Sequence, residues 1–166
     1  RRQRQMCIRD RDAVSERGIH TVVVKSSAQI GKTAILKAII GFHVDQDPAP
    51  ILMLQPTEHM AEAFSKDRLA PMIRDTPALK DKIADPRSRD SGNSILHKRF
   101  AGGHITLAGS NSPAGLASRP IRIVLCDEVD RYPASAGSEG DPVNLAIKRT
   151  ATFWNCLLYT SPSPRD

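Results

Sequence analysis

Short aliphatic runs alternate with longer amphipathic stretches along this 166-residue chain. The runs at residues 20–25, 51–54 and 121–126 have the length and β-branched or aliphatic composition of buried strands. Residues 34–42 repeat apolar side chains at helical spacing, and Gly41 is the predicted end of that helix. Strands alternating with helices predict an α/β fold with a mainly parallel sheet sandwiched by helices.

The remaining elements are predicted from turn and capping residues. Gly102-Gly103 lies between two extended runs, which predicts a β-hairpin insertion over residues 94–108. Pro at the first helical position, after a Thr or Asp cap, predicts two helix starts. The predicted helices cover about 58–70, a segment from Thr76-Pro77, and Asp141-Pro142 through about Phe153.

Composition narrows the picture to one ordinary globular domain, with 40% hydrophobic and 25% charged residues. Aromatic residues make up only 4%, which argues against a protein that binds single strands by base stacking. No apolar run approaches the roughly 18 residues of a membrane-spanning helix. The net charge is +6, but residues 1–11 alone carry most of it, so it is weak evidence for a nucleic-acid-binding face.

The three cysteines, Cys7, Cys126 and Cys156, are widely spaced and form no CxxC pair. Neither a zinc site nor a disulfide framework is therefore indicated, and a reducing, cytosolic setting is expected. Cys126 lies inside an apolar run, so we expect it to pack in the core.

The two ends of the chain differ in composition from the rest. Residues 1–11 are rich in arginine and glutamine, and residues 156–166 form a Ser-Pro tail. Both resemble translated sequencing-adapter read-through, and the alternative is a basic arm and a disordered tail. We interpret them as non-native ends, which leaves residues 12–155 as a partial P-loop ATPase domain.

A phosphate-loop pattern follows the first predicted strand. GxxxxGK[ST] is matched except that Ser replaces its first glycine, and the loop opens the first amphipathic helix. In such a loop, backbone N–H groups would bind phosphate oxygens. Lys32 would contact the β- and γ-phosphates, and the hydroxyl of Thr33 would bind Mg²⁺. Alone, the pattern is matched equally well by a helix start that happens to carry Gly-Lys-Thr. The predicted nucleotide-binding residues are Ser26, Ser27, Ala28, Gln29, Ile30, Gly31, Lys32 and Thr33.

An acidic pair, Asp127-Glu128, ends the run at 121–126. A carboxylate at the carboxyl end of a strand is expected beside the phosphate loop of the neighbouring strand. Asp127 would hold Mg²⁺, and Glu128 would activate the attacking water as general base. A solvated acidic turn is the alternative, but both motifs in order, each after its own strand, favour nucleotide hydrolysis. The predicted catalytic residues are Glu128 and Lys32, and the predicted metal-binding residues are Thr33 and Asp127.

Weaker candidates surround these motifs. Lys25, just before the phosphate loop, is either a second phosphate contact or a solvated strand end. Gln55-Pro56-Thr57 closes a strand at the edge where α/β folds bind ligands, or is simply a turn and helix cap. Arg119, Arg122 and Arg131 flank the acidic strand, and each fits a surface or structural role better than that of a charge-stabilising finger.

With both motifs placed, residues 22–153 resemble the ATPase domain of the large terminase subunit of tailed bacteriophages, in the group typified by phage lambda. In that family a loop lacking its first glycine is usual, so Ser26 is no defect. The stretches that carry the resemblance are KSSAQIGKT, DPAPILMLQPT, RLAPMI, TPAL, FAGGHITLAGSNSPAGLASRPIRIVLCDEVDRYP and GSEGDPVNLAIKRTATF, the fifth being the most specific.

The resemblance implies an ATP- and Mg²⁺-dependent motor that moves double-stranded DNA into a procapsid in the host bacterial cytoplasm. It implies as partners the DNA, the small terminase subunit, the portal protein and further copies in a ring, with no membrane. The family's coupling motif follows the last predicted helix, and we do not assign Thr160-Ser161-Pro162 to it. No nuclease activity is expected, since no nuclease domain is present in this sequence.

Two alternatives stay open. A helicase-like ATPase stimulated by nucleic acid would suit Gln55-Pro56-Thr57, although its acidic motif would have to be Asp127-Glu128-Val129-Asp130 and no second motor domain is present. The second alternative is a truncated fragment that binds nucleotide or DNA without turnover.

Overall fold

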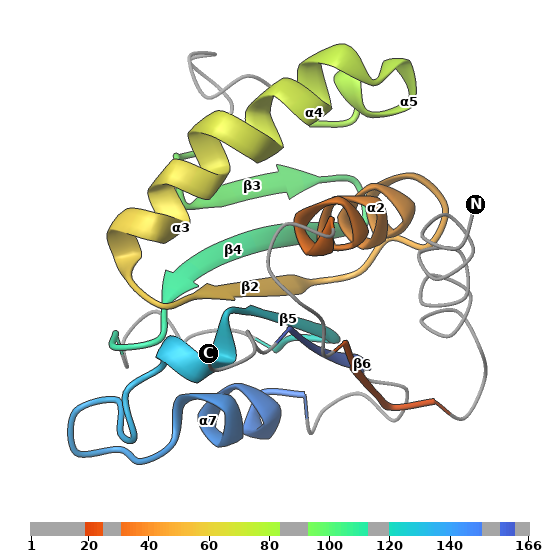
Figure 1. The fold of residues 1–166 in the computed structure, drawn as a ribbon. Coiled ribbons are helices and arrows are strands. Elements are labelled where there is room, and N and C mark those ends of the chain that lie inside the picture. The colour runs from red at the N-terminus through yellow and green to blue at the C-terminus, as the bar shows by residue number, and fades with distance from the viewer. Residues whose placement is uncertain (1–18, 25–30, 84–92, 113–119, 151–156, 162–166) are drawn as a thin grey trace.

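A six-stranded sheet forms the centre of the molecule (Figure 1). The computed structural model describes residues 19–24, 31–83, 93–112, 120–150 and 157–161. The strands lie in the order β1-β6-β5-β2-β4-β3, and all pairs are parallel except β3 with β4. The strands are β1 (Thr21–Val23), β2 (Ile51–Gln55), β3 (His97–Phe100), β4 (Gly103–Gly109), β5 (Ile123–Asp127) and β6 (Leu157–Ser161).

The parallel register brings the carboxyl ends of five strands to one edge of the sheet. Ile51 of β2 pairs with Ile105 of β4 and with Ile123 of β5, so these three strands run side by side from the same level. β6 joins β5 to β1, and its last residue, Ser161, is paired with Asp127. Ligands of open parallel sheets bind at such an edge, which is therefore where a site is sought.

Helices cover both faces of the sheet. In Figure 1, α2 and the long helical rod α3–η1–α4 lie on one face and α7 lies on the other. η1 is a π-helical turn inside the rod, and η2 is a single 3-10 turn directly after β5. The helical segments are α2 (Lys32–Asp45), α3 (Glu58–Phe64), η1 (Ser65–Leu69), α4 (Ala70–Asp75), α5 (Pro77–Lys80), η2 (Val129–Arg131) and α7 (Pro142–Lys148).

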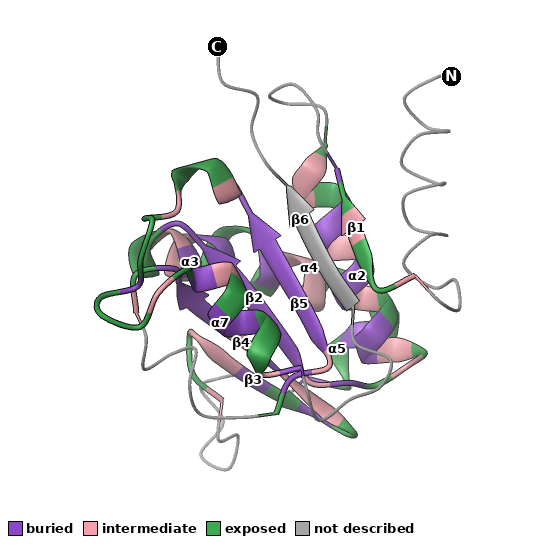
Figure 2. Ribbon diagram, turned by 90° about the horizontal axis from the view of Figure 1, so that it is seen from below, coloured by how far each residue is buried: buried purple, intermediate pink, exposed green. Residues whose placement is uncertain are grey.

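Alternate residues of the central strands supply two hydrophobic cores. Ile51 and Met53 of β2 pack in the core under α2 and α3, while Leu52 and Leu54 pack in the core under α7. β5 is buried at all five positions, as Figure 2 shows. Continuous apolar runs such as ILML read as strands buried on both faces because successive side chains point to opposite sides.

The structure confirms the α/β prediction and the hairpin. β3 and β4 turn at Gly102, whose φ of 84° lies in the left-handed region that favours glycine. The hairpin is not a separate insertion, since β4 also pairs with β2. None of the helices among the described residues is long and apolar enough to cross a membrane.

Three predicted helix boundaries differ from the structure. α2 does not end at Gly41, because His43 and Val44 continue its buried face to Asp45. The helix predicted over 58–70 continues through η1 and α4 to Asp75. The last helix ends at Lys148, and residues 151–156, where its predicted end falls, lie outside the described part.

One expectation about the strand order is wrong. The strand that ends in the acidic pair does not neighbour β1, because β6 lies between them. β6 comes from residues 157–161, inside the segment interpreted as a non-native end. Residues 1–11 lie outside the described ranges, and the non-native origin of either end stays a prediction.

Candidate active site

The amino terminus of α2 follows β1 at the carboxyl edge of the sheet. Gly31 begins it with φ 91°, a backbone conformation that glycine adopts without strain, and it has no side chain to cap the helix. Lys32 and Thr33 form the first turn and are half-buried. This helix start, with its exposed N–H groups and positive dipole end, suits an anion. Lys25 and the predicted phosphate-loop residues 26–30 lie outside the described residues.

Asp127 ends β5 as a buried carboxylate. Gln55, at the end of β2, donates a long hydrogen bond of 3.4 Å from Nε2 to Asp127 Oδ2. Burial raises the pKa of Asp127 above its ordinary value, against the lowering effects of the Gln55 hydrogen bond and the Lys32 charge. A bound cation would favour the ionised carboxylate in this position.

Glu128 stands directly after Asp127 in a strained backbone conformation. Its φ of 51° and ψ of 47° are left-handed, and it has the only positive φ outside glycine among the described residues. Such a conformation costs about 1–2 kcal/mol and needs support from its surroundings. Arg131 Nη1 lies 3.1 Å from Glu128 Oε2, an ion pair by distance, although the geometry makes no hydrogen bond and Oε2 has none within the described ranges.

Tyr132 fixes the turn that carries Glu128. Its hydroxyl donates a 2.9 Å hydrogen bond to the carbonyl oxygen of Leu54 in β2. Burial raises the pKa of this phenol well above its ordinary value. The neighbouring Cys126 is fully buried, and burial raises the pKa of its thiol to about 12. The acidic turn is therefore bonded to the strand that carries Gln55.

The loop between β2 and α3 is anchored to β4 by several contacts. Ser110 donates from its backbone N to Gln55 O at 2.8 Å and from its hydroxyl to Pro56 O at 2.9 Å. Thr57 caps α3 by accepting from Met60 N at 3.2 Å. A Cβ on Gly109 would lie 2.4 Å from Glu58 N, so only glycine fits where β4 passes this loop. These contacts fix the backbone of the segment that carries Gln55.

The side chains present fit a hard divalent cation. Asp127 offers a carboxylate. Among the described side-chain hydrogen bonds, one reaches this carboxylate, from Gln55 to Oδ2. Thr33 offers a hydroxyl on the helix that carries Lys32. Mg²⁺ prefers such oxygen ligands, taking one or two from the protein and others from phosphate and water. Within the ranges that the structure describes, no cluster of three or more His, Cys, Asp or Glu could hold a metal ion by itself.

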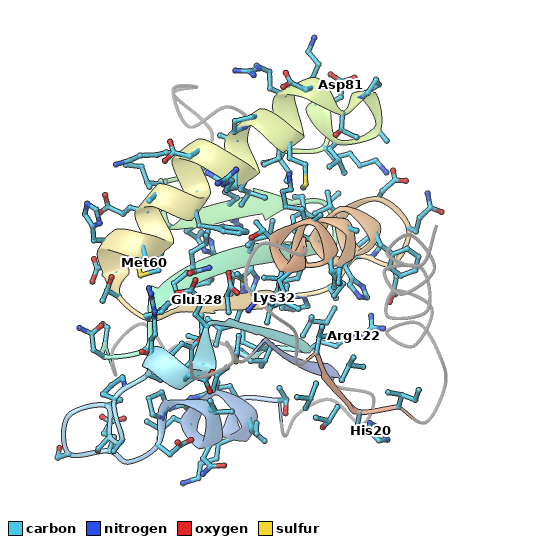
Figure 3. The ribbon with its side chains drawn as sticks, in the orientation of Figure 1. His20, Lys32, Met60, Asp81, Arg122 and Glu128 are labelled. Carbon is cyan, nitrogen blue, oxygen red and sulfur yellow. The ribbon has the colours of Figure 1, made fainter. Side chains whose placement is uncertain are left out.

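The remaining predicted candidates fall in different places. Arg122 lies at the opposite end of β5, where it forms two hydrogen bonds with Asp47, so it has the structural role that the sequence favoured (Figure 3). Arg119 lies outside the described residues. Cys126 packs in the core as predicted. Tyr132 was not among the predicted site residues, and an aromatic residue shortly after the acidic pair is the signal that pointed to it.

The chain is similar in sequence and fold to large terminases of bacteriophages. The "Terminase, large subunit" of Enterobacteria phage P21 is 28% identical over 132 residues, which are 79% of this chain and 21% of that protein. The chain thus spans about a fifth of the length of that relative. The large terminase ATPase domain of Thermus phage P74-26 superposes with a TM-score of 0.64 at 15% identity, covering 95% of this chain and 65% of that one.

The large terminase of another thermophilic bacteriophage, solved in complex with ATP-gamma-S, superposes with a TM-score of 0.58 at 20% identity. That match covers 87% of this chain and 32% of the other. At these identities the two superpositions show a common fold. A family model described as "Phage terminase large subunit gpA, ATPase domain" matches residues 8–165, nearly the whole sequence. The chain therefore belongs to the family of phage terminase large subunit gpA ATPase domains.

Proposed function

We propose that this chain is the ATP-hydrolysing motor domain of a phage terminase large subunit, which drives double-stranded DNA into a procapsid. The observation that carries the proposal is that the start of α2, with Lys32 and Thr33, and the acidic end of β5 lie at the same edge of the sheet. Lys32, at the start of α2, lies close enough to Asp127 for its charge to lower the pKa of that carboxyl.

Each residue of the site has a proposed task. Residues 26–31 would hold the phosphates through backbone N–H groups, with the Lys32 ammonium stabilising negative charge on the β- and γ-phosphates. Glu128 would accept a proton from the attacking water and orient it. Gln55 would hold one oxygen of Asp127 and so fix the orientation of that carboxylate.

Thr33 and Asp127 would hold Mg²⁺, which supplies charge neutralisation on the phosphates when bound. The raised pKa of Asp127 is consistent with a carboxylate that a cation completes. The partners proposed with this function are the DNA, the small terminase subunit, the portal protein and other copies of the chain in a ring. The proposed location is the host bacterial cytoplasm.

The test is Mg²⁺-dependent ATP turnover by the whole 166-residue chain, with and without double-stranded DNA. Lys32→Ala and Glu128→Gln are expected to abolish turnover, and Glu128→Gln to keep ATP binding, because the loop that binds phosphate is untouched. Lys66→Ala is the matched control, since Lys66 pairs with Glu62 on the exposed side of the α3–η1 rod. Stimulation by double-stranded DNA would support the motor.

Each alternative predicts a different result. ATP binding that needs Lys32, without turnover, would indicate a nucleotide-binding fragment of an incomplete motor. Strand separation by the intact parent protein would indicate a helicase-like ATPase. The absence of ATP binding would contradict the motor, the helicase-like ATPase and the nucleotide-binding fragment.

A further inference from the structure

Glu128 is held from both sides of its turn. The backbone N of Arg131 donates to Glu128 O at 2.9 Å, which closes the 3-10 turn η2 immediately after β5. Tyr132, the next residue, is bonded to β2 through its hydroxyl. The backbone of the predicted general base is therefore fixed, while its side chain depends on what surrounds the carboxylate.

Among the described ion pairs, the one that involves the Glu128 carboxylate is with Arg131. Its Nη1 lies 3.1 Å from Glu128 Oε2, and both side chains come from the same turn. Arg131 is 65% exposed and Glu128 is 33% exposed, so the pair adds little to folding stability. Its position beside a left-handed Glu at the end of a buried strand indicates a role in orienting that Glu.

Each of the two acids of the motif has one carboxylate oxygen against a neighbouring nitrogen, through a hydrogen bond at Asp127 and an ion pair by distance at Glu128. Gln55 Nε2 contacts Asp127 Oδ2, and Arg131 Nη1 contacts Glu128 Oε2. In each pair one carboxylate oxygen faces the partner, and the proposed function gives Glu128 a further task. For Glu128 that task is to receive the proton of the attacking water, which requires one oxygen in a defined place.

We propose that Arg131 is a positioning residue for Glu128: its guanidinium holds Oε2, so that Oε1 is directed at the attacking water. This inference rests on the proposed function. A positioning role differs from that of a charge-stabilising arginine finger, since Arg131 acts through Glu128 and does not touch the nucleotide.

The test compares ATP turnover and ATP binding in the full chain and its variants. Arg131→Gln is expected to lower kcat about tenfold to a hundredfold and to leave KM for ATP within about twofold, because misplaced bases lose rate and not affinity. Arg131→Lys is expected to restore part of the loss, since a lysine keeps the charge without the planar fork. Arg74→Gln is the control: Arg74 forms a similarly exposed pair with Asp75 on α4.

A double-mutant cycle separates positioning from a general structural effect. The background is Glu128→Asp, which keeps a carboxylate and is expected to keep a reduced but measurable turnover. In that background Arg131→Gln is expected to cause a much smaller loss of turnover than in the unaltered chain, because a positioning residue acts only through its partner. Additive losses, a loss confined to KM, or a faster kcat in Arg131→Gln would each overturn the role of Arg131 and leave the proposed function intact. No turnover in the unaltered chain would overturn the proposed function and this inference with it.

Discussion

The carboxyl groups at the two ends of β5 have pKa values shifted in opposite directions by their surroundings. At the carboxyl end, Asp127 meets Gln55 and the charge of Lys32. At the other end, Arg122 donates from Nη1 and Nη2 to the two carboxylate oxygens of Asp47 at 3.0 and 2.6 Å. Hydrogen bonds from Arg122 lower the pKa of Asp47, whereas burial raises that of Asp127. The Arg122 end is suited to stability and the Asp127 end to binding a cation.

His43 gives the fold a predictable pH dependence. It is buried on α2, with its Nδ1 3.4 Å from Asp47 Oδ2, and burial lowers its pKa from the ordinary 6.5 although Asp47 opposes the shift. Above pH 6.5 the imidazole is neutral in both the folded and the unfolded state. Below it the unfolded chain takes up a proton that the folded chain binds less readily, so the free energy of unfolding falls as the pH falls.

Urea unfolding between about pH 7 and pH 5 checks this expectation. His43→Gln is expected to flatten the dependence, because glutamine does not titrate. His59→Gln is the control on the exposed surface of α3 and should keep the slope of the unaltered chain. An unchanged slope in His43→Gln would contradict the assignment. Asp47 does not interfere in this range, because its lowered pKa lies below the ordinary 3.8.

Cys126 is predicted to be chemically silent in the folded protein. It is fully buried, and its pKa of about 12 leaves almost no thiolate at pH 8. In a chain with Cys7→Ser and Cys156→Ser, iodoacetamide at about pH 8 is expected to label Cys126 only after denaturant is added. Labelling of the native chain at a rate near that of a free thiol would show that the core under α7 opens readily.

At the scale of elements, replacing two glycines by alanine is expected to change the stability of the fold in opposite directions. Gly41 lies inside α2, and a Cβ there would meet Leu79 Cδ1 at 3.8 Å, an ordinary contact. Gly41→Ala is therefore expected to stabilise the fold by about 0.5–1 kcal/mol, because alanine loses less backbone entropy in a helix. Gly109→Ala forces a Cβ to within 2.4 Å of Glu58 N and is expected to destabilise by about 1–3 kcal/mol.

Thermal and urea unfolding of the two variants measure both effects. A stabilised Gly109→Ala would mean that the loop before α3 moves freely, and the rigid support of Gln55 would lose its basis. Destabilisation by Gly41→Ala would show instead that α2 and α5 pack too closely for a methyl group.

The first of these glycines also shows what the sequence could and could not predict. Apolar runs predicted the strands correctly, since burial on both faces leaves a continuous hydrophobic pattern in β2 and β5. Gly41 was a wrong helix end because the buried face resumes at His43 and Val44, and tertiary packing overrides a local stop signal. The hydrogen bond from Tyr132 to Leu54 could not be predicted, because the partners lie 78 residues apart.

The acidic motif was predicted correctly at the end of a strand. The strand next to it in the sheet was predicted wrongly, because β6 and not β1 is its neighbour. A parallel sheet leaves its strand order open, because each crossover can skip a position. Only long-range pairing decides that β6 lies between β1 and β5. Residues 157–161 were not predicted as a strand, because the composition of their segment differs from that of the rest of the domain.

At the scale of the whole molecule, β6 connects the two halves of the site. It pairs with β1 through three residues and with β5 through five, so among the described strands it is the one that joins the strand before Lys32 to the strand that ends in Asp127. A chain ending at residue 155 would leave one edge of β5 without its partner and β1 without any strand to pair with. Parallel strands need neighbours to satisfy their backbone groups, and exposed edges promote aggregation.

We therefore expect the chain 1–155 to lose its cooperative unfolding transition or to aggregate, while the chain 1–161 unfolds as the full chain does. Circular dichroism on heating and size-exclusion chromatography distinguish the two. The comparison holds the amino terminus constant and changes only whether β6 is present. If the chain 1–155 melts cooperatively at the temperature of the full chain, β6 is dispensable, and Lys32 and Asp127 must be held together by α2 and its core. If it does not, turnover lost in the chain 1–155 would report the loss of a strand rather than the chemistry of the site.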